Sequence, residues 1–158
     1  MIEFKPKVTA AAVVVRQGKY LMVREHTPDG IRLNQPAGHL DPFETLVHAA
    51  ARETLEETGW TVEPTGLLGM YLSRYQSQDH ETDVTYLRFT FLCRPVSHDS
   101  GLVLDDGIIE ALWLSPEQIR QSTAQHRSPQ VLQSLEYHLA GRLYPLDCIT
   151  TDPRCLQQ

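Results

Sequence analysis

Features that mark membrane-spanning, secreted or disulfide-linked proteins are scarce in this sequence of 158 residues. No apolar run approaches the roughly 20 residues that a membrane-spanning helix needs. The opening segment MIEFKPKVTA has no continuous apolar stretch of the signal-peptide type. Only three cysteines are present, an odd number without the spacing of a metal site, which predicts reduced thiols. We therefore expect a cytoplasmic protein with no membrane partner.

Positive charge is also in short supply, because 14 Lys and Arg residues stand against 20 Asp and Glu residues and give a net charge of −6. This balance argues against binding to a nucleic-acid polymer or to an anionic membrane surface. An acidic chain that binds a polyphosphate needs metal cations to bridge the two. The apolar content of 41% and the charged content of 22% are typical of globular proteins, so we expect one domain over residues 1–158.

Apolar and β-branched runs predict a chain in which strands and helices are mixed. Strands are predicted at residues 8–15, 20–24, 31–34, 67–75, 84–93 and 108–114. A short helix is predicted after Ser115 and another over residues 128–139, because each begins with a serine N-cap followed by a proline. The tail from Arg142 onward is expected to be extended.

The longest helix is predicted after Glu44, where Leu, Ala, Arg and Glu dominate and no Gly or Pro occurs before Gly59. Two starts compete for this helix. Asp41 is an N-cap candidate with Glu44 as its capping-box partner, and Thr45 is the rival N-cap. Gly59 is expected to end the helix.

Three glutamates on this helix share one face, because Glu53, Glu56 and Glu57 stand at positions i, i+3 and i+4. Like charges at this spacing repel, at a cost of a few tenths of a kcal/mol per pair. A hard divalent cation reverses the sign, since Mg²⁺ and Mn²⁺ take oxygen ligands. Taken alone, a pair of glutamates on a helix is more often a solvated face.

The wider spacing around the glutamates is more specific. The positions that define it are Gly38, Glu44, Arg52, Glu53, Glu56, Glu57 and Gly59. This spacing resembles the Nudix box. The resemblance implies an α/β/α sandwich with a mixed central sheet, in which the box forms a loop–helix–loop, and it favours the later helix start. Thr54 and Phe43 depart from the usual residues of the box, and both lie outside its ligand set.

The resemblance also implies a metal-dependent site. It assigns Glu53, Glu56 and Glu57, with the backbone carbonyl of Gly38, as ligands of Mg²⁺ or Mn²⁺. It assigns Arg52 and Glu44 as the brace between the loop and the helix. The catalytic set is therefore expected to contain Glu44, Arg52, Glu53, Glu56 and Glu57. Either Glu57 or Glu53 is expected to take the proton from the attacking water.

Other residues are candidates for parts of the site. Members of the family draw an extra carboxylate from the loop before the last strand, where the candidates are Asp105, Asp106 and Glu110. For Asp105 and Asp106 the alternative is a plain β-turn. The polar linker at residues 76–83 is either an exposed hairpin loop or the source of an outer ligand or base from Asp79, Glu81 or Asp83.

Substrate contacts are expected from two arginines and one tyrosine. Arg88 and Arg32 are candidates for binding phosphate oxygens, with surface ion pairs as the alternative for each. Tyr86 is a candidate for stacking on a ring, although alternation along a strand places half of its aromatics in the core.

A narrower resemblance extends over much of the chain. The segment at residues 34–40, the Arg127-Ser128-Pro129 sequence and the tail at residues 144–146 resemble one bacterial Nudix subgroup. Its members are phosphatases that remove a terminal phosphate from nucleoside di- and triphosphates. They also act on hydroxymethylpyrimidine diphosphate and thiamine diphosphate. The resemblance implies a monomer or homodimer that hydrolyses a small-molecule diphosphate.

Two alternatives to the phosphatase remain at this point. One is a Nudix pyrophosphohydrolase that releases a nucleoside monophosphate from a nucleoside triphosphate or from a compound of the ADP-ribose type. The other is a non-catalytic Nudix module that senses a nucleotide. The complete set of metal glutamates argues against the second alternative, because a pure binder need not keep them.

Overall fold

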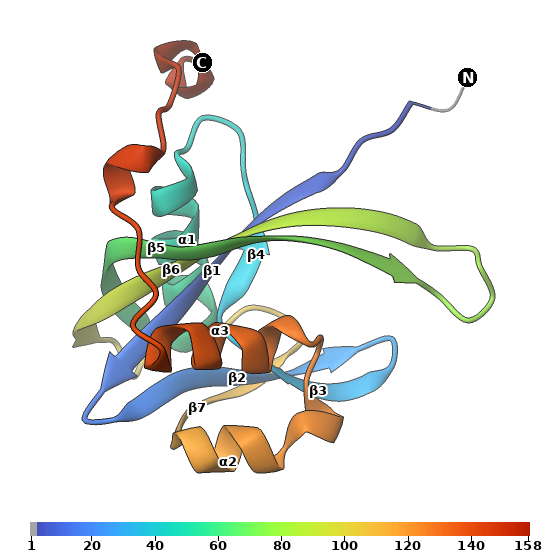
Figure 1. Ribbon diagram of the computed structural model, residues 1–158, viewed down its shortest axis with the longest axis vertical. Helices are drawn as coiled ribbons and strands as arrows, with labels where there is room; N and C mark the ends of the chain where they lie inside the picture. Colours follow the sequence, from blue (N-terminus) through green and yellow to red (C-terminus); the bar gives the residue numbers. More distant parts are fainter. Residues whose placement is uncertain (1–2) are drawn as a thin grey trace.

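The computed structural model describes residues 3–158, which form a mixed sheet flanked by helices (Figure 1). The elements in chain order are β1 (Lys7–Arg16), β2 (Lys19–Thr27), β3 (Gly30–Asn34), β4 (Ala37–His39), α1 (Leu46–Thr58), β5 (Trp60–Gln76), β6 (Asp83–His98), β7 (Ile108–Leu114), α2 (Pro116–Gln121), η1 (Thr123–Gln125), α3 (Gln130–Leu139), η2 (Leu146–Cys148) and η3 (Pro153–Leu156). No helix among residues 3–158 has the length and apolar character to cross a membrane.

The first strand, β1, connects the two halves of the sheet. The strand order is β3-β2-β1-β6-β5, with β4 also paired to β1 and β7 also paired to β2. The β1–β6 pairing is parallel, whereas the other pairings are antiparallel. The run from Ala10 to Val14 is completely or almost completely buried, as expected for a central strand with both faces covered. The sheet is therefore mixed, as expected from the resemblance.

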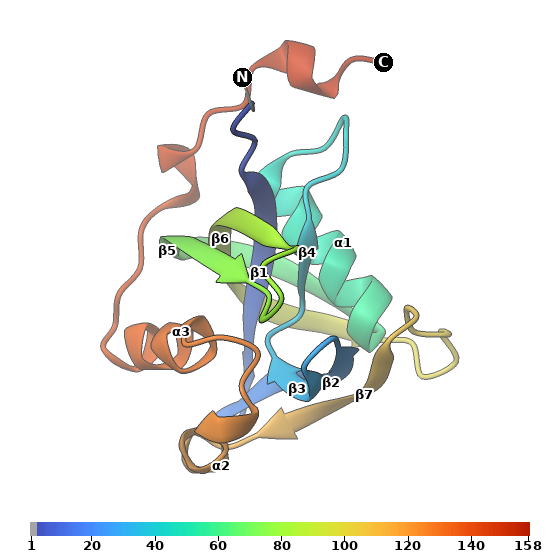
Figure 2. The ribbon, with the colours of Figure 1, turned by 90° about the vertical axis from the view of Figure 1, so that its right-hand side faces the viewer.

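Helices cover both faces of this sheet, and Figure 2 shows α1 on one side and α2 and α3 toward the other. On the first face, Ala49 and Ala50 of α1 belong to the same apolar cluster as Phe91 of β6. On the second face, Ile119 of α2 and Leu135 of α3 belong to a separate cluster that includes residues of β1, β2, β3 and β5. The expected α/β/α sandwich is confirmed.

The helix α1 begins at Leu46, which agrees with the later of the two predicted starts. Thr45 is the N-cap, because its hydroxyl accepts a hydrogen bond from the His48 N–H at 3.0 Å. The preceding loop turns at Phe43, whose φ of 67° lies in the left-handed region where glycine is favoured. Gly59 ends the helix with a φ of 77°, as predicted.

Three features of the fold differ from the sequence-based prediction. The strands β5 and β6 extend well beyond the predicted ranges 67–75 and 84–93, because bulges near Val62 and Pro64 absorb the irregular residues. A short strand, β4, lies in the segment that was expected to be a loop. The tail is not fully extended, since it contains the short helices η2 and η3.

Candidate active site

Three carboxylates form an acidic group where the loop before β7 meets α1. Side-chain oxygens of Glu53, Glu56 and Asp105 all lie within 4.8 Å of one another. The loop is attached to the helix by its backbone, because the Asp105 N–H donates a hydrogen bond to the Glu56 carbonyl at 3.1 Å. Of the three candidates in this loop and strand, only Asp105 joins the group. Glu110 instead accepts a hydrogen bond from Arg24 at 3.0 Å.

The negative charges of this group lie close together, and two of its three residues, Glu53 and Glu56, are partly buried. Burial raises the pKa of Glu53, and the negative charges of Glu56 and Asp105 raise it further, although Arg52 opposes the shift. Three carboxylates that repel one another in this way offer hard oxygen ligands to a divalent cation. The donor set therefore fits Mg²⁺ or Mn²⁺, the cations expected from the sequence.

Gly38 on β4 lies directly against this group. A Cβ atom on Gly38 would fall 2.1 Å from the carboxyl carbon of Glu53 and 2.2 Å from its nearer oxygen. No side chain fits in that space, so only glycine allows the β4 backbone to approach the carboxylate this closely. The structure thus brings Gly38 and Glu53 together, as the box predicts.

Arg52 connects the acidic group to the loop before α1. Its Nε and Nη2 atoms donate to the two carboxylate oxygens of Glu44, at 2.9 and 2.7 Å. Its Nη1 atom donates to Glu53 at 3.0 Å and to Glu56 at 3.1 Å, and its Nη2 atom also donates to the carbonyl of His39 at 3.0 Å. A planar guanidinium can serve these partners together because its donors point in fixed directions.

The ion pair between Glu44 and Arg52 is well shielded, since the Glu44 side chain is 6% exposed. Burial alone raises the pKa of Glu44. The hydrogen bonds from Arg52, from the Asp41 N–H and from His48 outweigh it and lower the pKa to about 2. The hydrogen bonds to Glu44 raise the pKa of Arg52, as do the charge of Glu53 and the hydrogen bond to it, while burial opposes the shift. The brace expected between these two residues is present.

Glu57 stands beside the acidic group but is not part of it. The residue is 7% exposed, and its carboxylate accepts a hydrogen bond from the Ala37 N–H at 2.8 Å. Burial raises the pKa of Glu57 to about 8; the charges of Glu25, Glu53 and Asp105 add to this shift, while the Ala37 N–H opposes it. Glu57 thus lies between the acidic group and the segment that joins β3 to β4.

Arg88 is buried on β6 and forms no ion pair with any other residue of the described range 3–158. It is 6% exposed, and its guanidinium donates to Thr90 at 3.3 Å, to Asn34 at 3.3 Å and to Gln35 at 2.9 Å. Burial lowers its pKa to about 10, while the nearby charges of Tyr71, Glu25 and Glu57 act in the opposite direction. The structure therefore places Arg88 within the protein, bonded to neutral side chains.

The two other substrate candidates lie in different places. Arg32 on β3 is partly exposed and donates to the carbonyl of its neighbour Ile31 at 2.9 Å. Tyr86 on β6 is half-buried, and its ring lies 6.3 Å from the ring of His39 on β4. Tyr86 precedes Arg88 by two positions and so points to the same face of the sheet.

The linker at residues 76–83 forms an exposed hairpin loop. Asp83 accepts two hydrogen bonds from Arg74, at 2.7 and 2.6 Å. Asp79 accepts from the Glu81 N–H at 3.0 Å and from the Ser77 hydroxyl. Because these carboxylates are used within the loop, the structure does not bring them into the acidic group.

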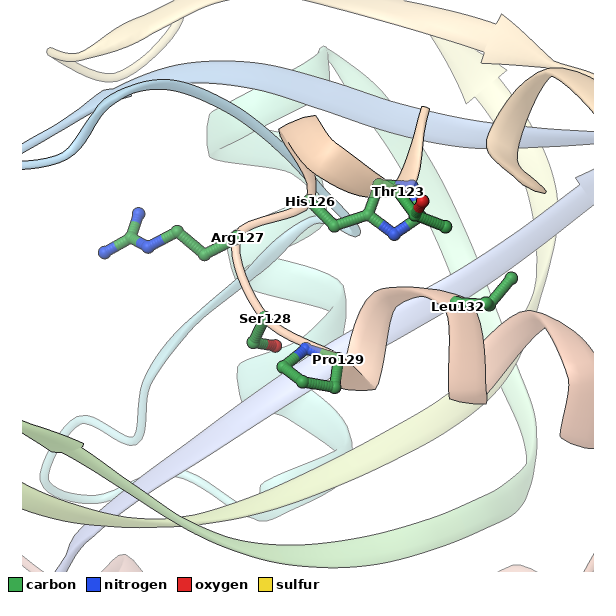
Figure 3. A pocket seen from close by; sticks show the side chains of 6 residues that line it. All are labelled: Thr123, His126, Arg127, Ser128, Pro129 and Leu132. Atoms are coloured by element: carbon green, nitrogen blue, oxygen red, sulfur yellow. The ribbon is translucent and has the colours of Figure 1, made fainter. Parts of the chain in front are cut away.

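A hollow of about 420 Å³ lies between η1 and α3 (Figure 3). Its lining residues are Thr123, His126, Arg127, Ser128, Pro129 and Leu132. Arg127 turns away from the other labelled side chains (Figure 3), and its guanidinium donates to Glu25 on β2 at 2.7 Å. Glu25 was not recognised in the sequence, because a single glutamate in a strand carries no spacing signal.

Comparison with known proteins places these observations in context. Residues 5–135 match the family model described as the NUDIX domain. The chain is 39% identical over 152 residues to Phosphatase NudJ of Escherichia coli strain K12, a match that covers 92% of each chain.

Solved structures give a similar result. A NUDIX hydrolase from Nitrosomonas europaea is 47% identical, with a TM-score of 0.84 over 94% of this chain and 98% of that one. A MutT NUDIX hydrolase from Burkholderia pseudomallei is 22% identical, with a TM-score of 0.68 over 84% of this chain and 98% of that one, and supports the fold alone.

Proposed function

We propose, since this chain belongs to the NUDIX family of hydrolases, that it is a metal-dependent phosphatase that removes the terminal phosphate of a small diphosphate. Its membership and its 39% identity to a phosphatase support hydrolysis of a phosphoanhydride bond in general. Our proposal goes further than family membership in three respects, which are the metal requirement, the bond that is cut and the substrate. The observation that carries the metal requirement is the group of three carboxylates beside Gly38 and Arg52, and the similarity to Phosphatase NudJ supports the choice of bond.

The proposed metal ligands are the acidic group and its neighbours. Glu53, Glu56 and Asp105 would hold Mg²⁺ or Mn²⁺, with the Gly38 carbonyl as a further ligand, whereas Glu57, which lies outside this group, would act on the attacking water. When bound, a divalent cation neutralises phosphate oxygens and lowers the pKa of water. The residues of the chain would supply the arrangement and the proton transfer.

Arg52 and Glu44 are proposed to act on the geometry of the site. Arg52 holds Glu53 and Glu56 from one side and fixes the loop through Glu44 and the His39 carbonyl. This arrangement limits the motion of the carboxylates before substrate arrives, so less order has to be created during the reaction.

Glu57 is our candidate for the residue that accepts the proton from the attacking water. Glu53 is committed to the three-carboxylate group and to a hydrogen bond from Arg52. Glu57 makes neither contact, and its position is fixed by the Ala37 N–H. A carboxylate held next to the reacting group in this way can act as a general base.

The substrate is proposed to be a nucleoside di- or triphosphate, or the diphosphate of hydroxymethylpyrimidine or thiamine. Arg32 and Tyr86 are proposed contacts of the substrate, for its phosphate oxygens and its ring respectively. We also propose one domain over residues 1–158, since the tail returns to the sheet. The N–H of Leu67 donates to the carbonyl of Tyr144, and the N–H of Tyr144 donates to that of Leu67, both at 2.8 Å.

Release of phosphate with a phosphate-specific dye tests this proposal. Nucleoside diphosphates and hydroxymethylpyrimidine diphosphate should give orthophosphate when Mg²⁺ is present and none after chelation. The same assay is then run on nucleoside triphosphates with and without added pyrophosphatase. A signal that appears only with the added enzyme would show release of pyrophosphate and exclude the phosphatase.

A further inference from the structure

Arg88 is a buried cation without a carboxylate partner. No ion pair joins it to an acidic side chain anywhere in residues 3–158, and its three side-chain partners, Asn34, Gln35 and Thr90, are neutral. Taking a guanidinium out of water is costly unless its donors are bonded. The hydrogen bonds of Arg88 offset this cost, and the side chains that they orient indicate the role of the residue.

Two of the bonds fix consecutive side chains at the end of β3. The amide oxygens of Asn34 and Gln35 both accept from Arg88. With their oxygens held, the amide nitrogens point the other way: Asn34 donates to Glu25 at 3.3 Å, and Gln35 donates to the carbonyl of Val131 at 2.9 Å. Each amide therefore has a donor on one side and an acceptor on the other, which sets its orientation.

The same segment of chain then enters the acidic site. The Pro36 carbonyl accepts a hydrogen bond from Ala12 at 3.0 Å. The Ala37 N–H donates to Glu57, and Gly38 lies against Glu53. Each of the five consecutive residues 34–38 is therefore held by a hydrogen bond or a close contact, from the Arg88 side chain at one end to Glu57 and Glu53 of α1 at the other.

We propose that Arg88 is a positioning residue for the metal site, which acts through Asn34 and Gln35 on the segment that carries Ala37 and Gly38. This inference rests on the proposed function, since it assumes that the cation is held by Glu53 and its neighbours. Arginine suits the role because its planar fork can reach two amide oxygens and a hydroxyl at once, whereas a lysine ammonium cannot hold that geometry. Bonds from a charged donor are also stronger than those between neutral groups.

Direct contact with substrate is disfavoured by the same observations. All three nitrogens of Arg88 already donate to protein side chains, and only 6% of the residue is exposed. The two N–H groups that remain belong to a guanidinium that is almost completely buried, so a phosphate has little access to them. Displacing Asn34 or Gln35 would break two bonds in either case, because Asn34 also donates to Glu25 and Gln35 also donates to the carbonyl of Val131.

The test compares Arg88→Met and Arg88→Lys with the wild type in two readouts. Binding of Mn²⁺ is measured by calorimetry without substrate, and kcat and KM are measured at saturating metal. Loss of a residue that orients ligands lowers metal affinity by about tenfold or more. We expect that loss in both variants, with a lower kcat and little change in KM. The matched control is Arg120→Met, because Arg120 is exposed on α2 and pairs only with Glu136.

Gln35→Ala provides a second, independent route that keeps the arginine. It should weaken Mn²⁺ binding as Arg88→Met does, and the double variant should lose little more, because both act along one path. If Arg88→Met does not fold, Gln35→Ala still tests the inference. Wild-type Mn²⁺ affinity in Gln35→Ala or Arg88→Lys would overturn it.

Other outcomes separate this inference from the proposed function. A raised KM with normal Mn²⁺ affinity in Arg88→Met would make Arg88 a substrate contact and overturn the positioning role. A wild-type protein that binds no Mn²⁺ and releases no phosphate would overturn the proposed function itself. The Arg88 inference fails alone if the wild type binds Mn²⁺ and turns over substrate while Gln35→Ala or Arg88→Lys binds Mn²⁺ equally well.

Discussion

Arg52 donates two parallel hydrogen bonds to the carboxylate of Glu44, although the two residues stand eight positions apart in the sequence. This separation is just over two helical turns, so the contact exists only because the loop before α1 folds back along the helix. Glu44 is thereby held almost out of solvent. The pair fixes the loop that leads from Gly38 to the helix.

The first prediction concerns this pair. Arg52→Ala should destabilise the protein by about 3–5 kcal/mol, because it leaves a buried carboxylate without its partner. A double-mutant cycle with Glu44→Ala, followed by urea unfolding, measures the coupling. The matched control is the exposed pair Arg120 and Glu136, whose side chains are 48% and 44% exposed and whose coupling should stay below about 1 kcal/mol. Equal couplings in the two cycles would contradict the brace.

The second prediction concerns acid stability. Burial raises the pKa of Glu44, but the hydrogen bonds from Arg52, the Asp41 N–H and His48 outweigh it and lower the pKa from 4.5 to about 2 in the folded state. The stabilisation is therefore complete above pH 4.5 and is lost as the pH falls toward 2. The free energy of unfolding should decline over that window in the wild type and decline less in Glu44→Gln. Parallel pH profiles for the two proteins would show that the pKa is not shifted.

The third prediction concerns Gly38. Gly38→Ala places a methyl group where the Glu53 carboxylate lies, so either β4 or the carboxylate must move. We expect a loss of stability of about 1–3 kcal/mol, as for other overpacked positions, and weaker Mn²⁺ binding by calorimetry. Gly101→Ala is the control, because its new Cβ would have only an ordinary contact of 3.5 Å with Asp99. Normal Mn²⁺ binding in Gly38→Ala would remove Gly38 from the site.

The fourth prediction concerns the ligand set. A cation that binds only the folded protein stabilises it by mass action, by about 2.7 kcal/mol at one hundred times Kd. Mg²⁺ or Mn²⁺ should therefore raise the Tm of the wild type, and Asp105→Asn should reduce that rise. Asp106→Asn is the matched control, since Asp106 lies outside the acidic group. A metal-induced rise that Asp105→Asn leaves intact would exclude Asp105 as a ligand.

The sequence was most informative where the site depends on local geometry. Glu53 and Glu56 share a helix face because of the 3.6-residue period, and their approach to each other follows from spacing alone. Thr45 and Gly59 were likewise predicted as ends of the helix, because their residue types are favoured at the N-cap and just after the last helical residue. The choice between Asp105 and Glu110 could not be made, because it depends on which way a loop folds back onto α1.

Contacts between distant segments were not predictable from the sequence. The surface ion pair considered for Arg88 is wrong, because Arg88 is buried and donates to the amides of Asn34 and Gln35. Nothing in those three residues indicates that the end of β3 lies within reach of the Arg88 side chain on β6, because β2 and β1 stand between the two strands in the sheet order. The ends of β5 and β6 were missed for a different reason, because Pro64 and Pro95 look like strand breakers unless a bulge is known.

The parallel pairing of β1 with β6 sets the order in which this molecule can assemble. Lys7 lies opposite Tyr86 and Val14 opposite Cys93, so the pairing closes a loop that contains β2, β3, β4, α1 and β5. Contacts this distant in sequence form slowly, because the entropy of closing the loop is lost before they contribute. During synthesis, α1 and its glutamates leave the ribosome well before β6 does. The acidic group therefore cannot be complete until β6 and the loop that carries Asp105 have joined the fold, so the site and the central sheet form together.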